Sequence, residues 1–491
     1  MVNNIYIITI DCLRESSATE RTAPFFQSLP IQFDRCWSNG TWTLPSHASL
    51  LSAKEPHEHQ TVARGDEFSK SEAKMPLRAK ENGFTTCLFT ENPEFSSDTG
   101  FESYMDYVNE DIHHKIFSST YSPSKAVEEV SIQAGLDVLS EVLVRENRLK
   151  NIVNVLFGGT SKIKRDTLGR NLTFPHRGRR VLRHIDSYLN SSSGQNLLLT
   201  NILEPHNPYY APPEEAAASL GFSFPKDERI ALKATDDTRR YLLKKSPSLP
   251  VEAKRKFGCW QDVFSRKHDI YEAHIREADT ILQKFYRKHV GVDDLLITVG
   301  DHGQLFGEER QVGHQTSFHP NGINVAFGIN PPDDWGDERM EITEPVSLSG
   351  IGSAVVKVLE GAIQTNTKFV ETVVANSQKD GFVTCCVDGP TWMLENLQEG
   401  TYNENKVEEY KTRKLGKITN QRMYVYESPW DCTDITETSF EIEGYDRTIV
   451  GTCDHQTRYL SEVEENWLSE QVNGGQGDPA INSRLEALGY K

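Results

Sequence analysis

Three short segments combine acidic, imidazole and hydroxyl side chains that together could bind a metal ion and attack an ester. Asp11 ends the first apolar run, and Asp301 and His302 directly follow a later one. Carboxylates and imidazoles are common ligands of divalent metals, and an ion beside the Thr43 hydroxyl would make that hydroxyl a better nucleophile. Taken singly, each segment also fits a structural role, because Asp11, Thr43 or Ser46 could cap a helix and Asp301 could sit in a capped turn.

Apolar runs rich in β-branched residues predict the strands that carry these segments. Helical stretches lie between the runs, and this alternation predicts an α/β fold with a mostly parallel sheet sandwiched by helices. After the first run, the expected strands are Phe84 to Thr90, Asn196 to Leu203, Asp294 to Val299 and Ile323 to Ile329. The expected helices include Ser124 to Arg145, Arg179 to Tyr188, Tyr271 to Lys288 and Val346 to Leu359.

Polar residues stand at the ends of three of these strands. They are Asp11, the stretch Glu204-Pro205-His206, and the pair Asp301-His302. Ligands of such sheets bind beyond the carboxyl ends of the strands. We therefore expect these side chains to lie together in one site.

The chain is long enough for a large domain and a smaller one, which we place at residues 1–365 and 366–491. A helix-rich insertion is expected at about 105–195, and its basic residues suit either a solvated face or an anion-binding lid. Beyond about residue 366 the pattern predicts a small antiparallel subdomain of short strands and turns, with a helix near Ser461 to Gln471. The basic residues of the expected insertion at about 105–195 are Lys162, Lys164, Arg165, Arg170, Arg177, Arg179, Arg180 and Arg183.

The order of the motifs resembles that of the sulfatase family, within the alkaline-phosphatase-like superfamily. The four motifs are Asp11-Cys12-Leu13-Arg14, Thr43-Leu44-Pro45-Ser46, His206-Asn207-Pro208-Tyr209 and Asp301-His302-Gly303. The resemblance runs from residue 4 to about 361 and leaves the insertion unmatched. It implies an alkaline-phosphatase-like fold and a metal-dependent hydrolase or transferase of sulfate or phosphate esters, including diesters.

The resemblance also implies a role for each matching residue. Thr43 would be both the nucleophile and a metal ligand, and His206 and His314 would contact the anion or protonate the leaving group. The other implied metal ligands are Asp11, Asp301 and His302.

Three positions depart from the sulfatase pattern. Sulfatases use a Cys or Ser that is converted to formylglycine, whereas this chain has Thr43, as the phosphodiesterases and phosphoglycerol transferases of the superfamily do. His47 replaces the family's Arg after Pro-Ser and is predicted to be catalytic, again as in the phosphodiesterases. Cys12 replaces a second acidic residue, and its thiol would suit a soft ion better than calcium.

The metal content follows from the segment that contains His206. Glu204-Pro205-His206-Asn207 lacks the spaced Asp and His of the two-metal phosphodiesterases, so we expect one divalent ion. Two carboxylates, an imidazole and a hydroxyl favour manganese or zinc, with calcium or magnesium as alternatives.

The composition restricts the partners. The formal net charge of −18 disfavours nucleic acid as a partner. The resemblance implies an anionic ester substrate, such as a glycan or a lipid headgroup, and because an acidic surface also repels anions, a local positive charge such as a bound metal ion would have to attract it. No transmembrane run or signal peptide is found, and the eight cysteines form no disulfide framework, which predicts a cytoplasmic protein.

Two further functions stay open. One is a true sulfatase acting on a sulfated glycan or an aryl sulfate, with Thr41, Ser46 or Ser49 as substitute hydroxyls. The other is a catalytically silent relative that binds a sulfated or phosphorylated glycan. The sequence does not decide between a hydrolase and a transferase, and it leaves the substrate and the oligomeric state open.

Overall fold

A computed structural model describes most of the chain. The described residues are 2–63, 65–96, 99–110, 177–207, 214–235, 248–314, 317–388, 407, 411–429, 435–454 and 459–469. Several predictions lie outside them: the helix Ser124 to Arg145, the basic residues Lys162, Lys164, Arg165 and Arg170, and the motif residues Pro208 and Tyr209.

The main sheet is mostly parallel, as the sequence predicted. Its neighbouring strands are parallel except at β9, which runs antiparallel to both β6 and β2. The expected strand Ile323 to Ile329 therefore exists but runs opposite to the others, and β2 was not predicted. In sheet order the strands are β10 (Met340–Ile342), β2 (Ile31–Trp37), β9 (Asn324–Asn330), β6 (Leu295–Gly300), β1 (Ile5–Ile10), β5 (Asn196–Ile202), β3 (Thr85–Thr90) and β4 (Tyr107–Glu110), with β11 (Val346–Ser347) paired to β2.

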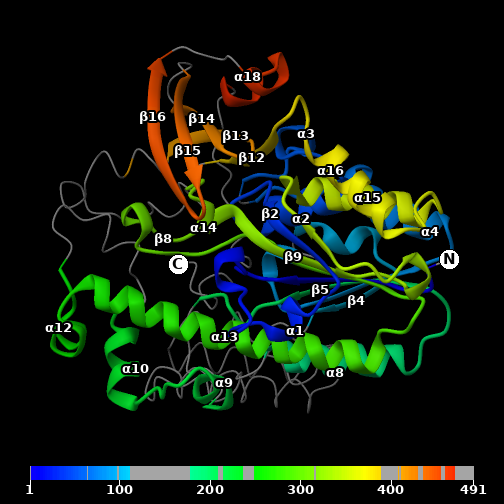
Figure 1. The fold of residues 1–491 in the computed structure, drawn as a ribbon, viewed down its shortest axis with the longest axis horizontal. Helices are drawn as coiled ribbons and strands as arrows, with labels where there is room; N and C mark the ends of the chain where they lie inside the picture. The colour runs from blue at the N-terminus through cyan, green and yellow to red at the C-terminus, as the bar shows by residue number, and fades with distance from the viewer. Residues whose placement is uncertain are drawn as a thin grey trace, which may run out of the picture.

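Helices cover both faces of this sheet (Figure 1). One face carries α1 (Pro24–Gln27), α8 (Arg177–Leu189) and α13 (Trp260–His289). The other carries α2 (Thr43–Ser52), α4 (Lys74–Glu81), α15 (Leu348–Leu359) and α16 (Asn366–Ser377), the last packed on α15. The predicted helix Val346 to Leu359 thus starts two residues later, after the short strand β11.

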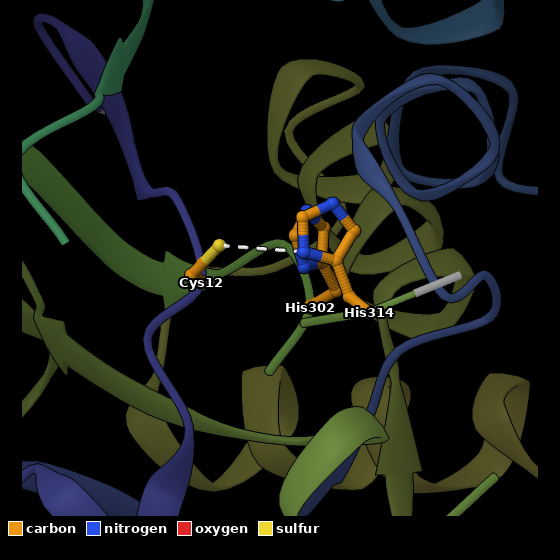
Figure 2. Close-up of side chains that lie close together, drawn as sticks. All are labelled: Cys12, His302 and His314. Atoms are coloured by element: carbon orange, nitrogen blue, oxygen red, sulfur yellow. Dashed lines mark hydrogen bonds between the residues drawn. The ribbon is translucent and has the colours of Figure 1, made fainter. Parts of the chain in front are cut away.

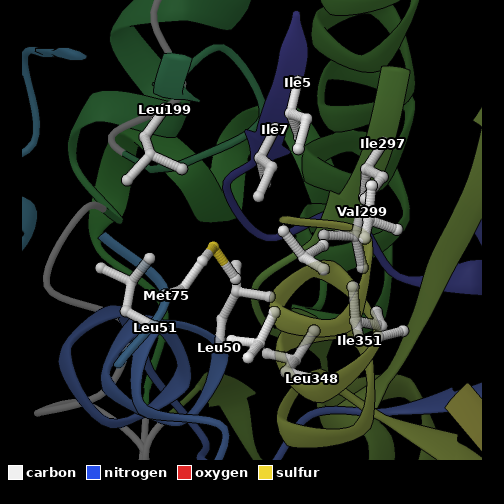
Figure 3. Close-up of a cluster of buried hydrophobic side chains, with 14 of the residues drawn as sticks. Ile5, Ile7, Leu50, Leu51, Met75, Leu199, Ile297, Val299, Leu348 and Ile351 are labelled. Atoms are coloured by element: carbon white, nitrogen blue, oxygen red, sulfur yellow. The ribbon is translucent and has the colours of Figure 1, made fainter. Parts of the chain in front are cut away.

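The strand β1 shows how alternation assigns side chains to the two faces. Ile5 and Ile7 pack into the core beneath α2 and α15, as Figure 3 shows, whereas Tyr6 and Ile8 pack toward α8 and α13. Because odd-numbered residues of β1 face α2, Asp11 leaves the strand on the side where α2 begins.

A close approach of two helix backbones fixes α2 against α15. A Cβ atom on Gly352 would lie 2.1 Å from the carbonyl oxygen of Leu50, so only glycine fits at this contact. Because Thr43 is the first residue of α2, this packing also sets the position of Thr43.

A second, antiparallel sheet forms the predicted C-terminal subdomain. Its strands follow sequence order, and the helix α18 (Glu462–Ser469) lies against one face through Trp467 and Leu468. The other face packs on Trp37, Phe318 and Ile323 of the main domain. The strands are β12 (Val383–Val387), β13 (Thr412–Ile418), β14 (Arg422–Pro429), β15 (Thr436–Glu443) and β16 (Asp446–Asp454).

The helix α16 was not predicted and lies where the sequence pattern indicated short strands and turns. The Thr365 side chain accepts a hydrogen bond from the Lys368 amide and so caps this helix. Phe369 and Val373, four residues apart, are buried on one side of it. The domain boundary at residue 365 stays a prediction.

Shorter elements complete the described part of the chain. They are α3 (Pro56–His59), α9 (Glu214–Ser219), α10 (Lys226–Lys233), α12 (Val251–Phe257), α14 (Pro320–Ile323), the pair β7 (Leu305–Phe306) and β8 (Val312–Gly313), and the 3-10 turns η1 (Glu15–Ser17), η2 (Lys70–Glu72), η3 (Pro93–Phe95), η5 (Phe101–Tyr104), η6 (Glu308–Arg310) and η7 (Asp333–Trp335). Within the described ranges, we find no helix with the length and apolar character needed to cross a bilayer.

Candidate active site

The carboxyl ends of adjacent strands bring the predicted acidic residues together. In the sheet, Ile10 of β1 pairs with Gly300 of β6, so Asp11 and Asp301 leave their strands at the same level. Both side chains are almost fully buried. The strand-end prediction therefore holds for this pair of residues.

Asp11 accepts hydrogen bonds from several directions and caps no helix. Its Oδ2 accepts from Asn92 Nδ2 at 2.7 Å, and its Oδ1 accepts from the thiol of Cys12 at 3.1 Å. The next helical turn, η1, has Arg14 as its N-cap. The capping interpretation of Asp11 is therefore wrong.

Asp301 presents one carboxylate oxygen with no hydrogen bond. Its Oδ1 accepts from the amides of Cys12 and His302, whereas the buried Oδ2 has no hydrogen-bond partner and lies 3.6 Å from His302 Nε2. Burial, and then the nearby charge of Asp301, raise the pKa of Asp11 well above its ordinary value. Two buried carboxylates in this arrangement call for a cation, and ligand atoms of Asp11, Asp301 and His302 all lie within 4.8 Å of one another. The donor set therefore fits a divalent metal ion.

A backbone hydrogen bond sets the orientation of His302. We assign its Nδ1–H as the donor to the Gly303 carbonyl, at 3.0 Å, which leaves the Nε2 lone pair directed toward Asp11 Oδ1, 3.6 Å away. This is the usual arrangement of a metal-binding imidazole. Gly303 is needed for a close approach, because a Cβ there would lie 2.1 Å from the Asn321 carbonyl oxygen.

Thr43 lies at the start of α2 with its hydroxyl among these ligands. Its Oγ1 is 3.4 Å from Asp11 Oδ2 and 3.5 Å from His302 Nε2. No side chain caps α2, so neither Thr43 nor Ser46 has the capping role that its sequence also allowed. An uncapped helix N-terminus attracts anions, and here it is the helix that carries Thr43.

His206 and His314 face the same cluster from two further loops. Their ring centroids are 5.4 Å apart, and the His314 ring lies 4.3 Å from that of His302. His206 Nδ1 hydrogen-bonds to the Asn207 carbonyl, and His314 Nδ1 to Gln304 Oε1 at 2.9 Å. The structure therefore brings together both histidines that the sequence assigned to the anion.

His47 is also adjacent, but its ring nitrogens bind protein groups. Nε2 contacts Thr9 Oγ1 and Nδ1 contacts the Thr43 carbonyl, each at 2.9 Å, and the ring stacks on Phe95. Burial lowers the pKa of His47, which favours its neutral form. Through these contacts, His47 connects Thr43 in the first turn of α2 to Thr9 of β1.

Sequence reasoning missed Asn92, which lies two residues beyond β3. Besides Asp11, its Nδ2 contacts Thr43 Oγ1 at 3.3 Å and Asn201 Oδ1 at 3.1 Å, and the residue is fully buried. Its one sequence signal was its place two residues after the predicted strand Phe84 to Thr90, a place that an ordinary turn residue would share.

Arg14 of the first motif points away from the cluster. Its guanidinium donates to Glu308 Oε1 at 2.8 Å and to the Gln304 carbonyl at 3.1 Å. It thereby joins the loop after β1 to the loop after β6. Arg14 supports the site without belonging to it.

The described end of the insertion is ion-paired. Arg179 pairs with Glu277 and Arg180 with Glu91, while Arg177 is buried at the start of α8. Of the two alternatives for the basic run, the solvated face fits the exposed Arg183, whereas Arg177 is buried and Arg179 and Arg180 are partly exposed and ion-paired. A role of the insertion as a lid stays a prediction.

Comparisons with known proteins agree with this geometry. The model of the family described as Sulfatase matches residues 15–361, which is more than half of the chain. No curated protein matches the chain. Among solved structures, the phosphonate monoester hydrolase of Agrobacterium radiobacter has a TM-score of 0.56 at 15% identity, covering 89% of this chain and 89% of that one.

Two further solved structures share the fold. A phosphonate monoester hydrolase from Silicibacter pomeroyi has a TM-score of 0.55 at 14% identity, covering 99% of this chain and 94% of its own. An enzyme solved with its substrate D-glucosamine-2-N,6-O-disulfate has a TM-score of 0.50 at 11% identity, covering 87% and 88%. At these identities the likeness establishes the fold, which is the alkaline-phosphatase-like fold that the motifs implied.

Proposed function

We propose that this chain, which belongs to the sulfatase family, is a metal-dependent hydrolase or transferase that cleaves a sulfate or phosphate ester through Thr43. The observation that carries the proposal is the position of the Thr43 hydroxyl, 3.4 Å from Asp11 Oδ2 and 3.5 Å from His302 Nε2. A hydroxyl nucleophile thus lies beside the residues that suit a cation.

One divalent ion would be held by Asp11, Asp301, His302 and Thr43. The buried Oδ2 of Asp301, which accepts no hydrogen bond, supports this assignment. The mixture of carboxylate, imidazole and hydroxyl favours manganese or zinc over calcium or magnesium. When bound, the ion would neutralise negative charge on the transferred group.

The protein side chains account for the movement of protons. Thr43 Oγ1 donates its hydrogen bond toward Asp11 Oδ2, which leaves an oxygen lone pair for attack on phosphorus or sulfur. As the bond from Oγ1 to that atom forms, the Oγ1 proton passes to Asp11 Oδ2, the bond to the leaving oxygen breaks, and a protonated His206 or His314 donates a proton to the leaving oxygen. A water or alcohol then attacks the Thr43 ester and gives its proton to the same histidine, while the bond to Thr43 Oγ1 breaks and Oγ1 takes its proton back from Asp11.

Two residues position the nucleophile in this proposal. His47 binds the Thr43 carbonyl and Thr9, so we give it a positioning role in place of the catalytic one predicted from the sequence. Asn92 donates to Asp11 and contacts Thr43 Oγ1, and so orients the carboxylate and the hydroxyl together.

A phosphorus ester is favoured over a sulfate. Two of the three alternative hydroxyls are engaged elsewhere, because Ser46 donates to the Trp42 carbonyl and Ser49 hydrogen-bonds to His59. The third, that of Thr41, is buried without a hydrogen-bond partner and is tested directly below. Thr43 cannot become formylglycine, which sulfatases use. Two structural neighbours are named phosphonate monoester hydrolases, which supports a phosphorus substrate.

The test is a substrate panel on protein supplied with manganese. Aryl sulfate, aryl phosphate monoester, aryl phosphodiester and aryl phosphonate are each offered to wild type, Thr43→Ala and Thr41→Ala. Thr41 is the matched control, because its buried hydroxyl lies two residues away with no hydrogen-bond partner. We expect turnover of a phosphorus ester in wild type and Thr41→Ala, and its loss in Thr43→Ala.

Other results would change the proposed nucleophile or the proposed function. Turnover that survives in Thr43→Ala would refute the nucleophile, and turnover of sulfate alone would favour the true sulfatase. A protein that binds metal but turns over none of the four esters would support the silent glycan-binding relative.

A further inference from the structure

Cys12 is placed at the cluster by an unusual backbone conformation. Neighbouring residues of a strand point to opposite faces, but Cys12 has a φ of 61°, in the left-handed region that few L-residues adopt. Its sulfur consequently lies on the Asp11 side, 3.1 Å from Asp11 Oδ1. Cys12 is completely buried.

The sulfur also faces the imidazole rings of His302 and His314. It lies 3.9 Å from His314 Nδ1, the contact that Figure 2 marks, and the figure shows the side chain directed toward His302 and His314. Ligand atoms of Cys12, His302 and His314 lie within 4.8 Å of one another, as do those of Asp11, Cys12 and His206. The unpartnered Oδ2 of Asp301 belongs to the overlapping group of Asp11, Asp301 and His302.

Other buried cysteines differ in their surroundings. Cys36, Cys385 and Cys386 lie within clusters of apolar side chains, where burial raises the pKa of each thiol. Packing explains those three thiols. It does not explain a thiol held between a carboxylate and imidazoles.

We propose that Cys12 Sγ is an additional ligand of the divalent ion and makes the site selective for zinc-like ions over calcium and magnesium. This inference rests on the one-ion site of the proposed function. Thiolate sulfur binds zinc and cobalt well and binds the hard ions calcium and magnesium poorly. On ligation the thiol proton leaves to solvent and sulfur donates a lone pair to the ion, with no change of oxidation state.

The test uses cobalt(II) as the probe, because a sulfur ligand adds an intense charge-transfer band to the cobalt spectrum. Metal-free protein is titrated with cobalt, as wild type, Cys12→Ser, Cys12→Asp and Cys259→Ser. Cys259 is the control for adventitious binding, since it is an exposed thiol. Cys12→Asp is included as a second variant that should still fold, because Asp tolerates the left-handed backbone conformation better than most residues.

We expect the sulfur band in wild type and in Cys259→Ser, and its loss in both Cys12 variants. Zinc binding by Cys12→Ser should weaken by at least about tenfold, and Cys12→Asp should gain affinity for calcium. Stoichiometric cobalt binding without the band in wild type, or a band that survives in Cys12→Ser, would overturn this inference alone. Failure of wild type to bind any divalent ion would overturn the proposed metal site as well.

Discussion

The hydrogen bond from Asn92 to Asp11 gives a quantitative test of how the site is positioned. Asn92 Nδ2 donates to Asp11 Oδ2 at 2.7 Å, while Asn92 Oδ1 accepts from the Glu94 amide at 3.0 Å and caps η3. Asn92→Asp preserves the shape of the side chain and the acceptor for Glu94. The substitution changes only the Nδ2 donor, which becomes an oxygen that faces the Asp11 carboxylate.

The expected magnitude follows from the charge of the acceptor. A hydrogen bond to a charged group contributes roughly 1.5–3 kcal/mol, so its loss should lower kcat/KM by about 10- to 100-fold. Two oxygens 2.7 Å apart also repel each other, which places the expectation for Asn92→Asp at the upper end. The weaker contact of Asn92 with Thr43 Oγ1, at 3.3 Å, adds to the same loss.

The assay is kcat/KM at saturating metal, so that reduced occupancy of the ion does not contribute. Asn201→Asp is the matched control. It adds the same charge nearby and keeps the oxygen that accepts from Asn92, and it loses only the donor to Thr9 Oγ1. We expect a much smaller loss in the control. Wild-type kcat/KM in Asn92→Asp, or equal losses in both variants, would refute the positioning role.

Three further predictions concern stability and proton transfer. Burial raises the pKa of Glu55 from 4.5 to about 7, so its contribution to stability is full below pH 4.5 and is lost as the pH rises through about 7. Chemical unfolding across this window should show a fall in the free energy of unfolding that is about 3 kcal/mol smaller in Glu55→Gln than in wild type. Part of the fall should remain in that variant, because burial also raises the pKa of Glu204 to about 7, and Glu58→Gln should keep the contribution of Glu55. Gly352→Ala should destabilise the fold by about 1–3 kcal/mol or more through the clash with α2, whereas Ser353→Ala, on the same helix, should leave the thermal midpoint near wild type. His314→Ala should lower kcat by about 10²- to 10⁴-fold for an alkyl leaving group and far less for an activated aryl one; equal losses for both would contradict a general-acid role.

The strand-end residues could be predicted because parallel strands buried on both faces read as continuous apolar runs. The runs ending before Asp11 and Asp301 are of this kind, and a carboxylate directly after such a run is conspicuous. The pairing of Ile10 with Gly300 then converts two distant sequence positions into neighbours. The place of Asp11, Asp301 and His302 in one site could therefore be predicted from the continuous apolar runs, together with the rule that ligands bind beyond the carboxyl ends of parallel strands.

Other features left no comparable signal. Asn92 follows a strand as an ordinary turn residue would, so its donation to Asp11 becomes visible only when β3 is placed beside β5. The direction of β9 depends on which strands flank it, and apolar composition is the same for either direction. His47 was assigned by similarity, whereas its contacts with Thr9 and the Thr43 carbonyl depend on how α2 packs on β1.

The nucleophile loop depends on both sheets, which bears on the predicted boundary at residue 365. Asn39, four residues before Thr43, donates to the Thr384 carbonyl and accepts from the Cys386 amide through its own carbonyl, both on β12. Its side-chain oxygen accepts from the Ser349 amide at the start of α15. The first strand of the C-terminal sheet and the last helix of the predicted catalytic domain therefore hold the same loop. A boundary drawn at 365 divides the sequence where its pattern changes, yet it separates Thr43 from part of the structure that positions its hydroxyl.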